Sequence, residues 1–156
     1  MKTPRVYVDT SVIGGCFDPE FAPWSLGLFQ DFRLGLLFPV VSDVVGTEIA
    51  GAPPIVRQQY AVLLTQGAEL LRASEEADEL AMAYAAQQIL PKKYENDSQH
   101  IALATVAGVD VLVSWNFRHI VHFDKIRLFN AVNQLKGYRP VAIHSPREVT
   151  IYGEEL

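Results

Sequence analysis

The chain has 156 residues, 49% of them apolar, with 13 Lys and Arg against 18 Asp and Glu and a net charge of −5. A chain of this length buries about 70% of the surface that it exposes when unfolded, so it needs no disulfide framework or structural metal. Its single Cys excludes an internal disulfide and a Cys/His zinc pattern, and indicates a reducing compartment. The negative net charge excludes a surface that binds nucleic acid all round, but it is compatible with a local basic rim.

The N-terminal segment has no long apolar stretch followed by a cleavage pattern, and the longest uncharged apolar run, residues 34–42, is too short to span a membrane. The sequence therefore predicts a cytoplasmic protein without a membrane segment. No repeat, linker or low-complexity block interrupts residues 1–156, which we interpret as a single domain.

Strands and helices are predicted to alternate along the chain. The short segment 5–8, rich in β-branched and aromatic residues, predicts a first strand that ends at Asp9, with a turn at Gly14-Gly15. A helix and a second strand follow within 23–41, and Ser42-Asp43 then begins a short helix that carries Glu48. The other expected elements are helices within 54–90 with a short strand over 69–72 between them, a helix over 96–107, a strand over 109–115, a helix over 125–135 and a strand over 141–144.

This alternation is typical of an α/β fold in which a mostly parallel sheet lies between layers of helices, a three-layer α/β/α architecture. In such folds, ligands bind outside the carboxyl ends of the strands. The residues to consider are therefore Asp9 and the segments that follow Val41 and Val113.

Three acids fit this placement. Asp9 ends the first strand, Glu48 lies on the helix after the second, and Asp97 is in the first turn of the helix that leads to the strand over 109–115. Converging carboxylates repel one another unless a divalent cation neutralises them, and Mg²⁺ prefers carboxylate oxygens. Each acid alone has an ordinary interpretation, as a turn cap, a solvated helix residue or a helix start. Their combination on separate elements favours a metal site.

Four segments resemble the PIN-domain nucleases, a family that includes the toxin ribonucleases of bacterial toxin–antitoxin pairs. The segments are VYVDTS, SDVVGTEI, NDSQHIALATVAGVDVLVSWNFRHI and NAVNQLKGYRPVAIHSPREV. The resemblance extends over nearly the whole chain. It implies a compact PIN-like α/β/α domain and Mg²⁺- or Mn²⁺-dependent hydrolysis of single-stranded RNA, with products that carry a 5′-phosphate and a 3′-hydroxyl. It also implies that Asp9, Glu48 and Asp97 are metal-binding acids and that Ser114 is the small hydroxyl residue at a strand end.

The chain has Asn116 where the family usually has an Asp. Asn116 keeps a carbonyl oxygen that can bind a metal, so we count it among the metal ligands and, with Ser114, among the catalytic residues. It brings no negative charge, and we therefore expect one firmly held ion and a second that arrives with the substrate. Asp124 is an alternative source of the missing charge, although a surface position is the simpler interpretation.

Basic residues lie close to two of these positions. Lys92 and Lys93 precede Asp97, and Arg118 follows Asn116, so the three form a candidate RNA-binding rim. Tyr94 or Phe117 could stack on unpaired bases. Ordinary surface charge and core packing are the competing interpretation, and the simpler one for every residue except Arg118. Apolar helices within 54–90 predict a homodimer or a surface for a cognate antitoxin, and the sequence does not separate the two.

Other signals are weaker. His100 lies one turn after Asp97 and either tunes the cleft or has a structural role beneath the helix start. His119 and His122 would share a helix face, and we interpret them as partly buried or rim residues. The chain lacks the GxSxG, GxxxxGK[ST] and GxGxxG motifs.

The alternative function is a catalytically weakened PIN-like module that binds RNA or a protein partner, and Asn116 is the feature that supports it.

Overall fold

The computed structural model describes residues 2–155, so both end residues of the domain predicted over 1–156 lie outside the described residues. Five strands form one sheet in the order β3-β2-β1-β4-β5, and every neighbouring pair is parallel. The strands are β1 (Arg5–Val8), β2 (Phe38–Ser42), β3 (Glu69–Leu71), β4 (Val111–Val113) and β5 (Ile143–His144). All five lie at the predicted places, and β4 and β5 are shorter than the apolar runs that contain them.

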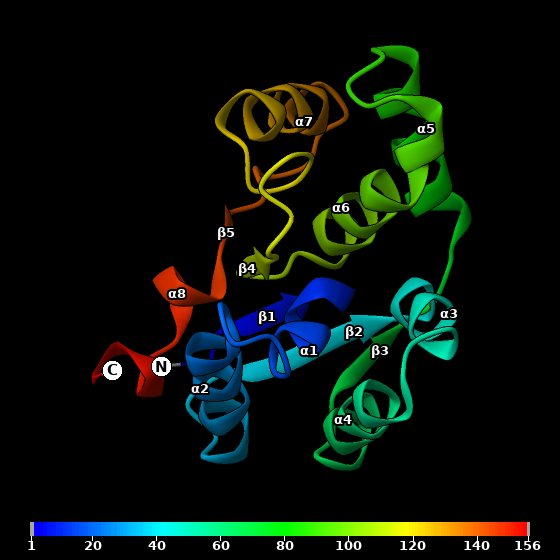
Figure 1. Cartoon of the computed structure of the whole chain (residues 1–156). Helices are drawn as coiled ribbons and strands as arrows, with labels where there is room; N and C mark the ends of the chain where they lie inside the picture. The colour runs from blue at the N-terminus through cyan, green and yellow to red at the C-terminus, as the bar shows by residue number, and fades with distance from the viewer. Residues whose placement is uncertain (1, 156) are drawn as a thin grey trace.

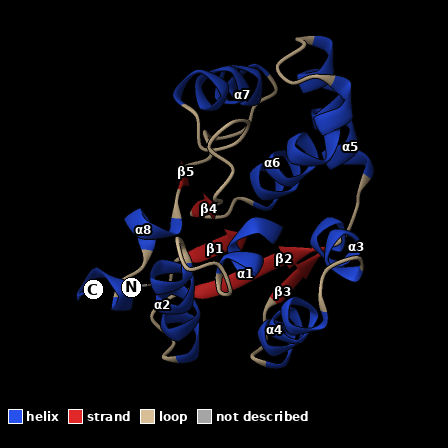
Figure 2. Ribbon diagram, viewed as in Figure 1, coloured by secondary structure: helices blue, strands red, loops and turns tan. Residues whose placement is uncertain are grey.

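Helices cover both faces of the sheet. Figure 1 shows α5, α6 and α7 on one side of it and α2 and α4 on the other, and Figure 2 shows the strands between these two groups. The helices are α1 (Thr10–Gly15), α2 (Ala22–Arg33), α3 (Asp43–Ala50), α4 (Pro54–Thr65), α5 (Glu75–Ala86), α6 (Glu95–Ala107), α7 (Phe123–Leu135) and α8 (Pro146–Val149), with 3-10 turns η1 (Lys92–Tyr94) and η2 (Tyr152–Glu155). The predicted α/β architecture is confirmed.

The position of the central strand β1 explains the continuous apolar run over residues 6–8. Val6, Tyr7 and Val8 are fully buried, because β2 and β4 flank the strand and helices cover its two faces. A strand that is buried on both faces gives a continuous apolar run rather than an alternating one. The strand ends at Asp9, which places the first predicted acid at the carboxyl edge of the sheet.

Short local signals set several helix ends. The Ser42 hydroxyl accepts a hydrogen bond from the Val45 amide at 3.4 Å, at the start of α3, and the Ser74 hydroxyl accepts one from the Ala77 amide at 3.1 Å, at the start of α5. Gly108 ends α6 in the left-handed region, with φ +66°, where glycine has no steric penalty. These caps confirm the predicted starts of α3 and α5 and the predicted end of α6.

The turn predicted at Gly14-Gly15 is wrong, because both residues belong to helix α1. Gly15 is required there for close packing. A Cβ at this position would lie 2.7 Å from both Ser25 Oγ and Trp115 Nε1, atoms that hydrogen-bond each other at 2.9 Å. Gly14 has open space at the same point. Gly15, and not Gly14, therefore reflects how closely α1 approaches its neighbours.

A buried carboxylate on α2 anchors the C-terminal segment. Asp31 is fully buried and accepts hydrogen bonds from Thr150 Oγ1 at 2.7 Å, the Ile151 amide at 3.0 Å and the Tyr152 amide at 2.7 Å. Charge-assisted hydrogen bonds of this kind are about twice as strong as neutral ones. The segment after α8 is thus fixed to the face of α2.

Within residues 2–155, no helix combines the length and the apolar character that a lipid bilayer would require of it.

Candidate metal centre

Asp9 is held in one orientation by hydroxyl groups. It follows β1 directly and is only 5% exposed. Its Oδ2 accepts hydrogen bonds from Ser11 Oγ at 2.8 Å and Ser114 Oγ at 2.7 Å, whereas its side chain makes no capping bond to the backbone of α1. Ser114, predicted as a supporting hydroxyl, therefore fixes Asp9. The simple turn-cap interpretation of Asp9 does not fit these contacts.

Glu48 reaches the same place from α3. Its Oε1 accepts a hydrogen bond from Thr10 Oγ1 at 2.9 Å and lies 2.5 Å from His100 Nε2, and 29% of its side chain is exposed. Burial alone would raise the pKa of Glu48, but the hydrogen bonds from His100 and Thr10 and the His100 charge bring the pKa below its usual value. Glu48 is therefore an anion in contact with a buried imidazole, and not a solvated helix residue.

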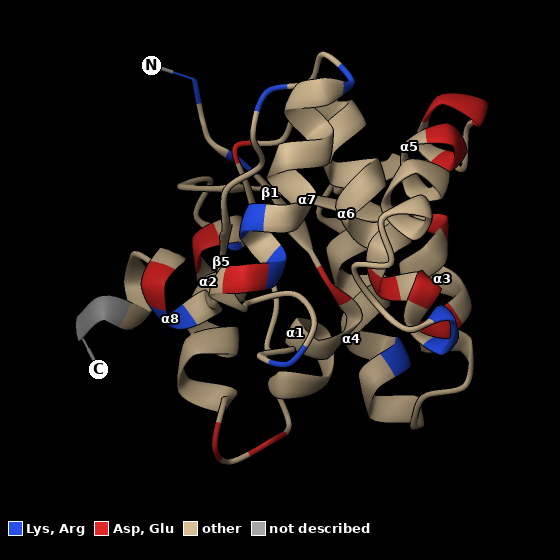
Figure 3. Cartoon of the chain, turned by 90° about the horizontal axis from the view of Figure 1, so that it is seen from above, with Lys and Arg blue, Asp and Glu red and all other residues tan. Residues whose placement is uncertain are grey.

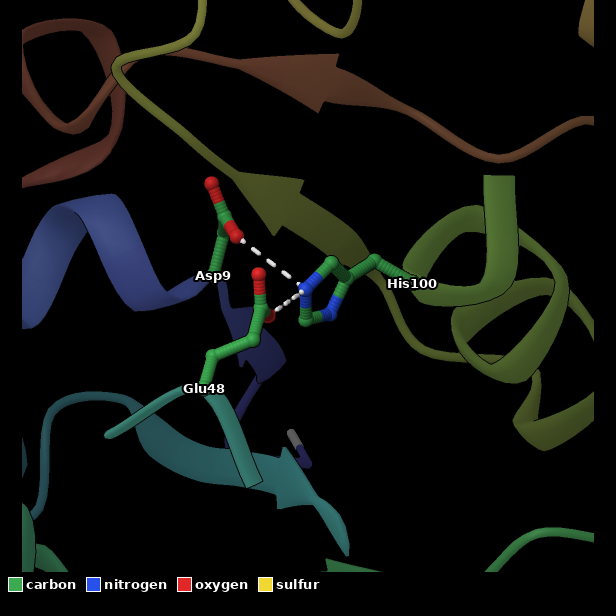
Figure 4. A group of neighbouring side chains, drawn as sticks. All are labelled: Asp9, Glu48 and His100. Carbon is green, nitrogen blue, oxygen red and sulfur yellow. Dashed lines mark hydrogen bonds and ion pairs between the residues drawn. The ribbon is translucent and has the colours of Figure 1, made fainter. Parts of the chain in front are cut away.

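His100 stands between the two acids. It lies on α6, is fully buried, and its Nε2 is 3.4 Å from Asp9 Oδ1 as well as 2.5 Å from Glu48 Oε1. Figure 4 shows the three side chains pointing toward one another from three separate elements. Burial alone would lower the pKa of His100, but the hydrogen bond to Glu48 and the surrounding carboxylates raise it. One ligand atom from each of the three residues lies within 4.8 Å of the other two.

Asp97 lies beside this group and is held by another set of contacts. Its side chain is 18% exposed, and its Oδ2 is 3.2 Å from His119 Nδ1 and 3.3 Å from Asn116 Nδ2. Burial raises the pKa of Asp97, and the negative charge of Asp9 raises it further. The carboxylates of Asp9 and Asp97 thus interact, although Asp97 is not in the tight group of three.

The side-chain oxygen of Asn116 is used inside its own turn. Asn116 Oδ1 accepts hydrogen bonds from the backbone amides of Arg118 at 3.2 Å and His119 at 3.0 Å, which leaves Nδ2 to face Asp97. These contacts fit a residue that shapes the turn and supports Asp97. Its predicted role as a metal ligand through Oδ1 stays a prediction and would require the turn to rearrange.

Two of the three predicted basic residues gather next to Asp97. Lys93 Nζ is 5.0 Å and Arg118 Cζ 5.9 Å from the centre of the Tyr94 ring. The same ring packs against His119, with 4.0 Å between ring centroids. Lys92 is exposed but lines a separate cavity of about 640 Å³ among α5, α6 and α7. The structure therefore brings Lys93 and Arg118 together and places Lys92 apart.

The structure gives the positions of three residues for which the sequence allowed more than one role. Asp124 is 60% exposed and pairs with Arg127 at 3.0 Å, so it does not supply the missing charge of the centre. His119 and His122 do not share a helix face, because both precede α7. His119 is buried against Asp97, and His122 is exposed.

Sequence reasoning missed the contacts behind His100. Tyr7 Oη lies 2.6 Å from His100 Nδ1 and 2.7 Å from Ser42 Oγ, and all three side chains are fully buried. One signal was available, because His100 is three residues after Asp97 and residues at that spacing share a helix face. The signal was incomplete, because Tyr7 and Ser42 are 93 and 58 positions away and only the sheet brings them near.

The donor set fits a hard divalent cation. One oxygen of each acid is held by side-chain hydrogen bonds, while the other oxygen accepts none from the residues that the structure describes. Among the described side chains, no Lys or Arg forms an ion pair with Asp9, Glu48 or Asp97, and only histidines do. Partly buried carboxylates that have free oxygens and no Lys or Arg partner are suitable ligands for Mg²⁺ or Mn²⁺.

Comparison with known proteins gives a structural match but none in sequence. No protein-family model matches the chain. No curated protein matches it either. A chain in the crystal structure of VapBC2 from Rickettsia felis bound to a DNA fragment from their promoter superposes with a TM-score of 0.58 and 10% identity, covering 90% of this chain and 98% of that one. Identity this low concerns the fold alone. The parallel five-stranded sheet, its strand order and this match together give the protein a PIN-like fold.

Proposed function

We propose that the protein is a divalent-cation-dependent endoribonuclease that hydrolyses phosphodiester bonds of single-stranded RNA. One observation carries the proposal: Asp9 and Glu48, from separate elements, converge at the carboxyl edge of a PIN-like sheet in a partly buried place. Burying two carboxylates side by side is costly unless a cation compensates them. A structural role alone does not explain why oxygens of both remain free of hydrogen bonds.

Asp9, Glu48 and Asp97 would hold the cation, with Mg²⁺ and Mn²⁺ as the candidates. When bound, the ion would offset the negative charge that develops on the phosphate oxygens during hydrolysis. Ser11, Ser114 and Thr10 orient the acids, because each donates a hydrogen bond to one of their oxygens. Asn116 and His119 hold Asp97 in the same way.

The group formed by Lys93, Tyr94 and Arg118 is suited to an unpaired RNA strand. The two cations can neutralise phosphates, and the aromatic ring offers a face on which a base can stack. The group is next to Asp97, through His119. Lys and Arg lie on several elements in Figure 3 rather than on one large face, which favours local contact with a few nucleotides. Phe117, half exposed after Asn116, is a second candidate for stacking.

The test compares cleavage by the wild type and by Asp9→Asn, with Asp124→Asn as the control. Both variants lose one carboxylate, but Asp124 is a surface residue. We expect the wild type to cut an unstructured RNA only with Mg²⁺ or Mn²⁺ and to leave 5′-phosphate ends. Asp9→Asn should lose at least about a hundredfold in rate, because the ion and the orienting hydrogen bonds are both affected. Cleavage by Asp9→Asn at the rate of the wild type would refute the proposal.

The second candidate is a weakened module that binds RNA or a protein partner without cutting. The engagement of Asn116 Oδ1 by backbone amides favours it, because the oxygen is not available to an ion. RNA binding by the wild type without cleavage under any divalent cation would support this candidate over the nuclease.

A cognate antitoxin is the protein partner that we propose. VapBC2 from Rickettsia felis, one of the structural neighbours, was crystallised bound to a DNA fragment from their promoter. In the present chain, a groove of about 840 Å³ between α2 and α4 is lined partly by the exposed apolar side chains of Leu26, Val62 and Tyr152. Coexpression with the product of the adjacent reading frame should give a stable complex. Light scattering of the isolated chain tests the predicted homodimer.

A further inference from the structure

A buried histidine points into the group of acids that we propose as the cation site. Asp9 and Glu48 reach the edge of the sheet from β1 and α3, and His100 enters from α6 on the opposite side of the group. Its Nε2 lies 3.4 Å from Asp9 Oδ1 and 2.5 Å from Glu48 Oε1. The side chain has no exposed surface, so the direction of this nitrogen is fixed by the fold.

The other ring nitrogen has the partner that a metal-binding histidine needs. Histidines that bind metals usually give their second ring N–H to a neighbouring oxygen, which fixes the tautomer and the ring orientation. His100 Nδ1 lies 2.6 Å from Tyr7 Oη, and this hydroxyl lies 2.7 Å from Ser42 Oγ. Nδ1–H can therefore donate to Tyr7, and Tyr7 can donate to Ser42. Without an ion, Nε2 carries a hydrogen that it donates to Glu48. A cation would take the place of this hydrogen and bind the lone pair of Nε2, which faces the acids.

We propose that His100 is a nitrogen ligand of the cation site and that it gives the site a preference for Mn²⁺ over Mg²⁺. The proposal rests on the cation site of the proposed function and adds a residue and an ion preference to it. Imidazole nitrogen binds transition metals well, whereas Mg²⁺ is bound almost entirely by oxygen ligands. Mn²⁺ accepts both oxygen and nitrogen. A set of two carboxylates and one imidazole therefore favours Mn²⁺.

The separations of the ligand atoms are compatible with this assignment. Neighbouring ligand atoms of one small divalent ion lie roughly 3 Å apart, because each is about 2.1 Å from the ion. The 3.4 Å between Nε2 and Asp9 Oδ1 is near this value. The 2.5 Å between Nε2 and Glu48 Oε1 would have to widen by roughly half an ångström. Glu48 is the most exposed of the three side chains, so it is the one with room to shift.

A positioning role is the competing account. In that case Nε2 keeps its hydrogen and only holds Glu48 through a hydrogen bond, and no nitrogen binds the ion. His100→Gln separates the two accounts, because the glutamine amide can still donate to Glu48 but offers no imidazole. A positioning role is rescued by this substitution, whereas a ligand role is not.

The experiment loads the full chain with Mn²⁺ and uses pulsed electron paramagnetic resonance to detect nitrogen bound directly to the ion. Labelling with ¹⁵N-histidine identifies the nitrogen as imidazole. His119→Gln and His122→Gln are the controls, one beside Asp97 and one exposed. We expect histidine coupling in the wild type and in both controls, and its loss in His100→Gln. The ratio of Mn²⁺ to Mg²⁺ affinity, from titration of each ion, should fall about tenfold in His100→Gln.

Three results would overturn the assignment: no Mn²⁺ binding, Mn²⁺ binding without histidine coupling in the wild type, or coupling that disappears in His119→Gln and remains in His100→Gln. Should His100→Gln fail to fold, Tyr7→Phe replaces it. This variant removes only the oxygen behind Nδ1, and we expect it to weaken Mn²⁺ binding about tenfold or more; unchanged binding would count against the proposal. Histidine coupling in a protein that cuts no RNA would refute the nuclease function and leave the ligand assignment in place.

Discussion

Replacing Asn116 by Asp is the most informative single perturbation of the centre. Asn116 Nδ2 now donates toward Asp97 Oδ2 at 3.3 Å. In Asn116→Asp, an anionic oxygen would take the place of this donor, while the two backbone amides would still bind the other oxygen. Two unit charges 3.3 Å apart repel by about 1 kcal/mol at the dielectric constant of water and about 5 kcal/mol at an effective value near 20. Asp97 is partly buried, so we expect the metal-free variant to lose about 2–4 kcal/mol of unfolding free energy at neutral pH.

The assay is urea unfolding at two pH values, with and without a divalent cation. Burial and Asp9 already raise the pKa of Asp97, and a second carboxylate would raise it further. A carboxyl with a raised pKa destabilises the fold as pH rises above its unfolded value, so the deficit of the variant should shrink as pH falls toward 4. Mg²⁺ or Mn²⁺ should stabilise Asn116→Asp more than the wild type, because the cation meets one more anion. We also expect tighter cation binding and faster cleavage.

The matched control is Asn96→Asp, which adds the same charge at an exposed position of the same helix start as Asp97. Its unfolding free energy should stay within about 1 kcal/mol of the wild type, because an acid in the first turn is weakly favourable. Equal stability of Asn116→Asp and the wild type in metal-free buffer would refute the reasoning. It would mean that the carboxylate at 116 turns away from Asp97.

Three further predictions follow from single contacts. Gly15→Ala should cost about 1–3 kcal/mol in urea unfolding, because its Cβ has no room, whereas Gly14→Ala should be neutral or slightly stabilising; equal effects would contradict the packing argument. Asp31→Asn should lower the free energy of unfolding by about 2–3 kcal/mol and expose the segment after α8 to proteolysis. The reason is that an amide NH₂ group would replace one carboxylate oxygen, and this group cannot accept the hydrogen bonds that the oxygen now accepts. Cation affinity should rise with pH, because a proton on His100, whose pKa is raised, neutralises the acids that a cation would bind. The ion pairs of protonated His100 stabilise the metal-free fold at pH values below about 6.5, the pKa of histidine in the unfolded chain, and this stabilisation is lost as pH rises through the higher pKa of His100 in the folded protein. A cation affinity that does not change with pH would refute this view.

The sequence predicted the elements well where their signals are local. The hydroxyls of Ser42 and Ser74 cap the helices that follow them, and Gly108 ends a helix in the one conformation that favours glycine. Each signal acts within a few residues, so the neighbouring residues in the sequence are enough to find it. Gly14-Gly15 misled for the opposite reason. The need for glycine at 15 comes from Ser25 and Trp115, which are distant in sequence.

The same contrast between local signals and contacts distant in sequence applies to the candidate site. Asp9, Glu48 and Asp97 could be named because each lies at the end of a strand or on the helix beside one, where an α/β fold binds ligands. The role of His100 could not be settled from the sequence, because it depends on contacts with Tyr7 and with the acids beside Nε2, which are distant in sequence. The contacts of Asn116 were equally out of reach, since they depend on how its turn folds.

The position of β1 has a consequence for synthesis. β1 leaves the ribosome before the other strands of the sheet, although it lies at the centre and pairs with β2 and β4 on its two sides. Ser114, which holds Asp9, lies 105 positions further along the chain. Pairing over such a separation is slow to form and depends on the segments between the two residues being present. A nascent chain released before β4 would have Asp9 and Glu48 but would lack β4 and Ser114, so Asp9 is fixed in place only after β4 and Ser114 have been made.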